Sequence, residues 1–144
     1  MNLELIDQRI IDKLHDNNWN ENKKDISLII DIFNDEGLTI FNYAKEILTY
    51  FQGAIISFTF DELKQHGVSN FYGDIQFDAS LASGLSDFIL DRSKFLQEDL
   101  YPIGFINGQM LLCVGRTKHI YTFSPLQPLI LGENMIDFLN KILG

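Results

Sequence analysis

LYPIGFINGQMLLCVG, residues 100–115, contains two apolar runs that are separated by the dipeptide Asn107-Gly108. Asn-Gly is the strongest short-range signal for a β-hairpin, because a type I′ turn needs positive φ at both central positions. We therefore predict that the two runs are neighbouring antiparallel strands. A second turn at residues 115–118 leads to a third strand, from His119 to Phe123, which completes a meander.

Five other stretches repeat their apolar residues at intervals of three and four, which is the period of an amphipathic helix. The expected helices cover residues 3–14, 26–36, 41–51, 79–97 and 135–143. Two further strands are predicted from β-branched and aromatic content at residues 54–60 and 74–78, with a loop between them bracketed by His66-Gly67 and Tyr72-Gly73.

The order of these elements indicates the fold class. Helices come first, then mostly strands with one inserted helix, and a helix closes the chain, which is an α+β arrangement. We expect an antiparallel sheet of about five to six strands that is flanked by helices and covered on one side. At 144 residues and 46% hydrophobic content, residues 1–144 are expected to form one domain.

Composition and net charge indicate where the protein is located and which kinds of partner it can bind. No stretch approaches the ~20 apolar residues of a membrane span, and the acidic start lacks the pattern of a signal peptide. Cys113 is the only cysteine, which agrees with a reducing compartment, so we expect a cytoplasmic protein. The net charge of −9 disfavours binding to nucleic acid or anionic lipid and favours a basic partner.

The pattern resembles the SUKH superfamily, in particular its branch of bacterial immunity proteins from polymorphic toxin systems. The resemblance rests on four segments in order: Leu14 followed by Asn18-Trp19, residues 44–53, residues 100–104 and residues 131–144. Two positions depart from the family pattern. Gln52-Gly53 stands where a Gly-Gly pair is frequent, and Phe105 stands where an acidic residue is frequent.

The resemblance implies a SUKH-like α+β domain that binds and neutralises a cognate toxin domain, by occluding the toxin's active or docking surface. An acidic immunity protein suits a toxin that is a basic nuclease. The alternative is a regulatory or scaffolding module of the same superfamily that binds an endogenous protein. The residues alone do not separate these two hypotheses.

The chain shows no pattern of catalytic residues, so we do not expect an enzyme. Its three histidines, His15, His66 and His119, are isolated from other ligands, and we expect no metal and no cofactor. Asp74 and Asp78 share one face of a strand at a spacing of about 13 Å, too far apart for one carboxylate to activate the other.

Acidic residues between Asp74 and Asp99 are the expected partner-binding surface. The leading candidates are Asp74, Asp78, Asp87 and Asp91. Asp87 and Asp91 are four residues apart and therefore share a helix face. We expect the stripe of Leu81, Leu85, Phe88 and Ile89 to pack inward and turn that face outward.

Two points stay open in the sequence. Residues 1–36 hold nine acidic and four basic residues, so Asp31 and Asp35 mark a competing acidic surface. Trp19 stands among polar residues, which fits either a side chain that pins the first helix to the sheet or one exposed for a partner.

Overall fold

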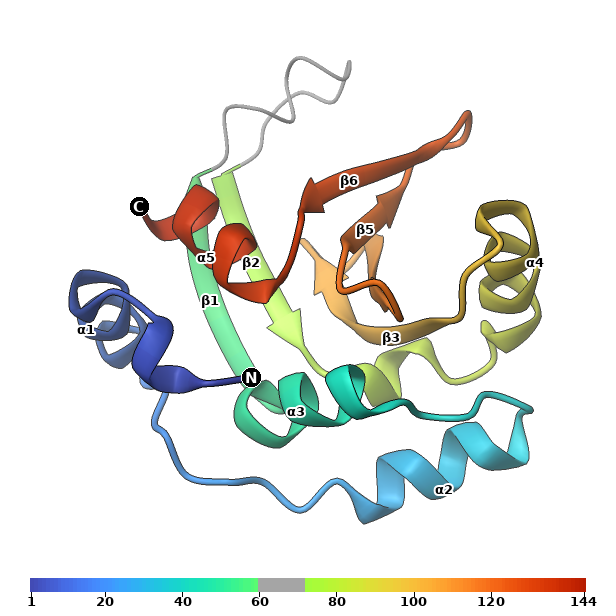
Figure 1. The fold of residues 1–144 in the computed structure, drawn as a ribbon, viewed down its shortest axis with the longest axis horizontal. Coiled ribbons are helices and arrows are strands. Elements are labelled where there is room, and N and C mark those ends of the chain that lie inside the picture. Colours follow the sequence, from blue (N-terminus) through green and yellow to red (C-terminus); the bar gives the residue numbers. More distant parts are fainter. Residues whose placement is uncertain (60–71) are drawn as a thin grey trace.

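A six-stranded antiparallel sheet organises the protein in the computed structural model, which describes residues 1–59 and 72–144 (Figure 1). The strands follow each other in chain order, each paired with the next. They are β1 (Ala54–Thr59), β2 (Tyr72–Phe77), β3 (Leu100–Ile106), β4 (Met110–Gly115), β5 (Ile120–Phe123) and β6 (Pro128–Gly132). The helices are η1 (Leu3–Leu5), α1 (Gln8–Asp16), α2 (Ser27–Asp35), α3 (Asn42–Phe51), η3 (Ala79–Ala82), α4 (Ser86–Leu96) and α5 (Met135–Leu143).

The turn between β3 and β4 has the geometry that its sequence predicts. Asn107 has a φ of 52° and Gly108 a φ of 67°, so both central positions are in the left-handed region that a type I′ turn requires. The Asn107 side chain also accepts a hydrogen bond from the backbone N of Asp74 in β2, at 3.0 Å. The turn therefore links three adjacent strands.

Helix α5 closes the sheet by contacting both of its edge strands, β1 and β6. Figure 1 shows α5 lying between these two edges, with the sheet curved around it. Helix α3 packs on β3, in the middle of the sheet. The predicted α+β class and the antiparallel sheet of about five to six strands flanked by helices are confirmed.

The expectation that helices cover only one face of the sheet is wrong for its central part. Cys113 and Tyr121 pair across β4 and β5, and Phe123 points to the same face as Tyr121. Phe123 contacts Phe88 of α4, with ring centroids 5.7 Å apart. The opposite face carries Tyr101, which contacts Phe33 of α2. Helix α4 thus covers one face while α2 and α3 lie on the other.

Two predicted helices are each interrupted. Residues 3–14 divide into η1 and α1, because Ile6 is extended and the Asp7 side chain caps α1 by accepting a hydrogen bond from the Arg9 backbone N. Residues 79–97 divide into η3 and α4, and Gly84 between them has a φ of 91°. A left-handed residue cannot continue an α-helix, so the apolar spacing across this point did not reflect one continuous helix.

Two strand boundaries also differ from the prediction. β6 was not predicted from the sequence, because a proline usually interrupts a strand; β6 starts at Pro128, and a proline is tolerated on an edge strand. Tyr72-Gly73 belongs to β2 rather than to the loop before it. His66-Gly67 lies outside the described residues.

β3 contains a register shift between Pro102 and Gly104, where β3 also lies very close to β2. A Cβ atom placed on Gly104 would stand 2.1 Å from the backbone oxygen of Gln76. The backbone of β2 cannot yield as a flexible side chain would. Glycine at this position is therefore required by the close approach of two strands.

We predict that Gly104→Ala lowers the free energy of unfolding by at least about 2 kcal/mol, because the added methyl group forces the β2 and β3 backbones apart. Urea unfolding followed by circular dichroism measures this loss. Gln109→Ala, at an exposed turn position of the same hairpin, is the control and should stay within about 0.5 kcal/mol of wild type. Equal stability of the two variants would contradict the close approach.

Trp19 pins the segment after α1 to α3. Its side chain is only 4% exposed, and its indole Nε1 donates a hydrogen bond to the backbone oxygen of Tyr50 at 2.8 Å. The indole also stacks on Phe51, with ring centroids 5.5 Å apart. Of the two possibilities that the sequence left open, the structure supports the pin, but its partner is helix α3 rather than the sheet.

Removing this anchor should destabilise the fold. Trp19→Ala is predicted to cost about 3–5 kcal/mol of unfolding free energy, because it leaves a large cavity against Phe51. Trp19→Phe should cost less, since it keeps an aromatic ring and loses the hydrogen bond to Tyr50, worth about 1 kcal/mol. Urea unfolding of both variants tests this order of stability. The order would be reversed or absent if Trp19 made no contact with α3.

Candidate interaction surface

Helix α4 presents large apolar side chains to solvent. Only Ser86 and Ile89 of this helix are buried, whereas Phe95 is 71% exposed and Phe88 is 36% exposed. Leu81 and Leu85, just before the helix, are also exposed. The expectation that Leu81, Leu85 and Phe88 pack inward is therefore wrong, and of that stripe Ile89 alone is buried.

The exposed face of α4 combines aromatic and acidic residues. Asp91 is three residues after Phe88 and four before Phe95, so helix geometry places its carboxylate beside both rings. Asp87 is one further turn back on the same side, and both carboxylates are exposed. We call Asp87, Phe88, Asp91 and Phe95, with the neighbouring Leu85, the α4 surface.

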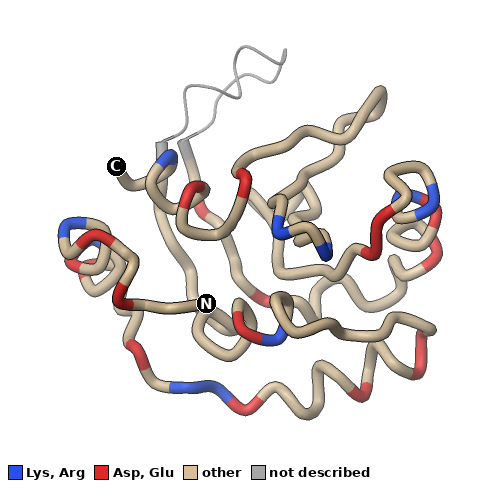
Figure 2. Tube along the Cα trace, in the orientation of Figure 1, with Lys and Arg blue, Asp and Glu red and all other residues tan. Residues whose placement is uncertain are grey.

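The four predicted partner-binding residues do not form one surface. Figure 2 shows acidic positions on β2, near the middle of the fold, and others on α4 at its far end. Asp74 accepts a hydrogen bond from the Ser57 hydroxyl at 2.8 Å. Asp78 caps η3 and accepts hydrogen bonds from Ser80 and from the Gln52 side-chain amide. The structure brings together only Asp87 and Asp91.

Asp87 and Asp91 are the carboxylates of this set that have no partner among residues 1–59 and 72–144. Neither forms a hydrogen bond or an ion pair with any of the residues that the structure describes. Their charges are consequently available to another molecule, while Asp78 is committed to the start of η3.

A row of rings continues from α4 onto the sheet. His119, Tyr121 and Phe123 alternate along one face at the end of the meander, and Phe88 meets Phe123 edge to face. The Arg92 guanidinium lies 4.6 Å from the centroid of Phe88. Aromatic and arginine side chains are the types enriched where binding energy is concentrated in protein interfaces.

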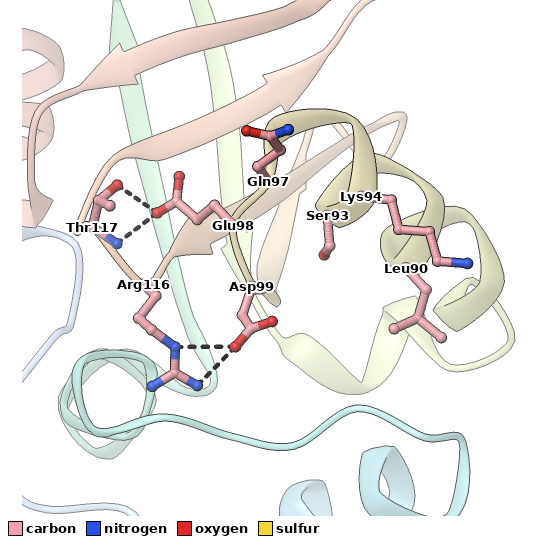
Figure 3. Close-up of a pocket in the computed structure, with 8 residues that line it drawn as sticks. All are labelled: Leu90, Ser93, Lys94, Gln97, Glu98, Asp99, Arg116 and Thr117. Carbon is pink, nitrogen blue, oxygen red and sulfur yellow. Dashed lines mark hydrogen bonds and ion pairs between the residues drawn. The ribbon is translucent and has the colours of Figure 1, made fainter.

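An open pocket of about 480 Å³ lies between the C-terminal end of α4 and the β4–β5 turn (Figure 3). The carboxylate of Glu98 accepts hydrogen bonds from the backbone N and the hydroxyl of Thr117, and another from the Tyr121 hydroxyl at 2.9 Å. Arg116 donates two hydrogen bonds to Asp99, at 2.8 and 3.0 Å. These polar groups satisfy one another.

Tyr121, which binds Glu98 beside this pocket, and Cys113, in β4, are both held in their protonated forms. Burial, with the nearby Glu98 carboxylate, raises the pKa of Tyr121 to about 12, so the phenol stays protonated. Burial also raises the pKa of the Cys113 thiol, which keeps this cysteine unreactive at neutral pH. Among the described residues, no cluster of three histidine, cysteine or carboxylate side chains could hold a metal ion.

Within that same part of the chain, no helix is both long and apolar enough to cross a membrane.

Glu36, which the sequence did not single out, fixes the start of α4. Its carboxylate accepts hydrogen bonds from the Ser83 hydroxyl at 2.7 Å, the Gly84 backbone N at 2.9 Å and the Ser86 hydroxyl at 2.6 Å. The bond from Ser86, followed by those from Ser83 and Gly84, lowers the pKa of Glu36. The end of α2 is in this way tied to the beginning of α4.

The spacing of the apolar residues did not reveal which side chains are exposed. Five of the six apolar residues in the segment 85–96 fall on one side of a helix, the pattern of a buried stripe, and only Leu90 falls outside it. The structure nevertheless exposes Phe88 and Phe95. No signal identified Glu36 either, because its three donors lie nearly 50 residues away in the chain.

Comparison with known families gives a match to the family model of the SUKH-3 immunity protein, across residues 6–144. The chain belongs to the SUKH-3 immunity protein family. Membership of SUKH-3 confirms the resemblance to the SUKH superfamily and supports a role in immunity. Neither a search of curated proteins nor a search of solved structures gave a match.

We predict that the tie between α2 and α4 depends on pH. Because its folded-state pKa is lower than the ordinary 4.5, the Glu36 carboxylate contributes stability above that value, and the contribution is lost as the pH falls through the folded-state pKa. Glu36→Gln should therefore be less stable than wild type at neutral pH. The difference should shrink as the pH is lowered below 4.5.

Urea unfolding at neutral pH and at about pH 3.5 measures this effect. Asp35→Asn is the matched control, since it removes a neighbouring exposed carboxylate that accepts no hydrogen bond from the described residues. It should change stability by less than about 0.5 kcal/mol. A difference between Glu36→Gln and wild type that does not vary with pH would argue against a role for the charge.

Proposed function

We propose that this protein binds a cognate toxin domain in the cytoplasm and neutralises it by occluding the toxin's active or docking surface. The observation that carries the proposal is the match to the SUKH-3 immunity protein family over residues 6–144. Neutralisation by binding needs a rigid scaffold with an exposed complementary surface. It needs no reactive group in the immunity protein itself.

Charge supports a protein partner with a basic surface. The net charge of −9 repels the phosphates of nucleic acids and anionic lipid headgroups, and it attracts a cationic protein over long distances. A toxin that is a basic nuclease fits this description. The immunity protein would then compete with the nucleic acid for the cationic surface of the toxin.

Expression of the toxin domain encoded by the neighbouring gene tests this function. We expect bacteria that produce this toxin domain to survive only when the immunity protein is produced with it. The purified proteins, with the toxin inactivated by substitution, should form a stable complex. Their association rate constant should fall by about tenfold or more from low to high salt, because screening removes long-range attraction.

A toxin domain from an unrelated system is the control and should be neither bound nor neutralised. Survival that does not require the immunity protein, or the absence of a complex with the active pair, would contradict the proposal. Binding to an endogenous protein in place of the toxin would instead favour a regulatory or scaffolding module.

A further inference from the structure

The α4 surface is the largest exposed aromatic feature of the part of the chain that the structure describes. Four of the exposed large apolar side chains lie within one short segment, from Leu81 to Phe95. Elsewhere, Leu5, Leu28 and Ile55 are separated along the chain, and Leu126 and Ile130 form a smaller, purely aliphatic pair at β6. Scattered exposed apolar residues are normal, but a contiguous group usually marks a surface that binds another molecule.

The geometry of α4 resembles the organisation of a protein interface. Phe88 and Phe95 are seven residues apart, so they stand two turns apart on one helix face. Asp91 lies between them and Asp87 lies at the edge, which places two carboxylates on one side of the rings, while the Arg92 guanidinium lies against Phe88 on the other. Stable interfaces combine a desolvated aromatic centre with a polar rim in this way.

Helix α4 is held firmly enough to present this surface without rearrangement. Glu36 binds Ser83, Gly84 and Ser86 at its start, and Ile89 is completely buried. Phe88 is held against Phe123. A side chain ordered before binding loses less conformational entropy when a partner covers it.

The net negative charge of the chain favours a cationic protein over a second copy of the chain as the partner. A second copy of the same protein would bring another net charge of −9 to the surface, and self-repulsion opposes that contact. A cationic protein is attracted by the same field. Asp87 and Asp91 offer its lysine or arginine side chains two carboxylates that no described residue of this chain engages.

We propose that the α4 surface is the docking site for the toxin, with Phe95 and Phe88 covered by an apolar patch on the toxin and with Asp87 and Asp91 paired to basic residues at the edge of that patch. This inference rests on the proposed immunity function and names the surface that performs it. Asp74 of β2 and Asp78 at the start of η3 lie outside the contact.

Helix α2 supplies a matched control surface. Leu28 is 72% exposed, nearly the same as Phe95, and Asp31 and Asp35 are exposed and four residues apart, as Asp87 and Asp91 are. Helix α2 has no exposed aromatic side chain. The two helices therefore offer the same number of free carboxylates with and without an aromatic centre.

The experiment compares four variants with wild type, using the inactivated toxin domain encoded by the neighbouring gene as the probe. Phe95→Ala tests the aromatic centre and Asp87→Lys/Asp91→Lys tests the rim. Leu28→Ala and Asp31→Lys/Asp35→Lys are the corresponding changes on α2. Circular dichroism and thermal unfolding first establish that each variant is folded, and exposed helix positions are expected to tolerate these substitutions.

Phe95→Ala should raise the Kd for the toxin by roughly 30-fold or more, the range of an interface hot spot, mainly through faster dissociation. The Asp87→Lys/Asp91→Lys variant should slow association and reduce its dependence on salt. Both α2 variants should keep the Kd within about threefold of wild type. Protection of cells should follow the same order.

The outcomes separate the docking site from the function. If wild type binds the toxin and both folded α4 variants bind equally well, the α4 surface is not the docking site, whether or not the α2 variants bind. If only the Asp87→Lys/Asp91→Lys variant is unfolded, the Kd of the Phe95→Ala variant tests the docking site by itself. If wild type neither binds nor protects, the proposed function fails and the docking site fails with it. A wild-type dimer that Phe95→Ala converts to a monomer would assign the surface to a second copy and overturn the proposal.

Discussion

The contact of α5 with both β1 and β6 is the constraint on which the rest of the structure depends. A flat six-stranded sheet would leave its two edge strands far apart, so a single short helix can touch both only if the sheet curves strongly. The approach is tight where β6 meets α5, since a Cβ atom on Gly132 would lie 2.8 Å from the backbone N of Phe138. Edge strands are prone to pair with other molecules, and the helix helps to protect them. On β1 the Asn17 side chain also accepts the hydrogen bond of the Ser57 backbone N.

Helix α4 is packed against the rest of the protein less completely than the other helices. Helices α2 and α3 and the closing helix α5 are engaged with the core, whereas α4 contacts β3 and the end of β5 through one side only. Ile89 supplies the buried contact, and the Glu36 carboxylate holds the beginning of the helix. Leu90 and Leu96 pack partly against the core, whereas Phe95 and part of Phe88 are left exposed to solvent. Such residues are expected on a helix whose second side is covered by a partner.

Charge and shape have separate roles in a protein that acts by binding. The acidic surface as a whole accelerates the encounter with a basic protein, and its effect weakens as salt is added. Aromatic side chains that become desolvated determine how long the complex lasts. In this chain the two properties meet on α4, where Asp91 lies beside Phe88 and Phe95. On α2 the carboxylates have no aromatic neighbour on the same exposed face.

The sequence alone determined the features that depend on neighbours along the chain. Asn107-Gly108 specified the hairpin because a two-residue turn is a local structure, and the alternation of apolar residues identified most strands and helices. The SUKH resemblance, which rests on the order of these segments, was confirmed over residues 6–144. Tertiary structure decided the rest. β6 exists because β5 is available to pair with a segment that begins at a proline, and the tie between Glu36 and Ser86 joins residues 50 apart.

The candidate binding surface could likewise be predicted from the sequence only in part. Sequence spacing placed Asp87 and Asp91 on one helix face, and the structure confirms that both are exposed. It could not show that Asp78 is used as a cap or that Phe88 and Phe95 face outward. Except for Leu90, the apolar residues of α4 share one side of the helix, and their period did not reveal that the sheet would cover only part of that side. Only the position of the helix against Phe123 decides that, because burial depends on what packs against a side chain in three dimensions.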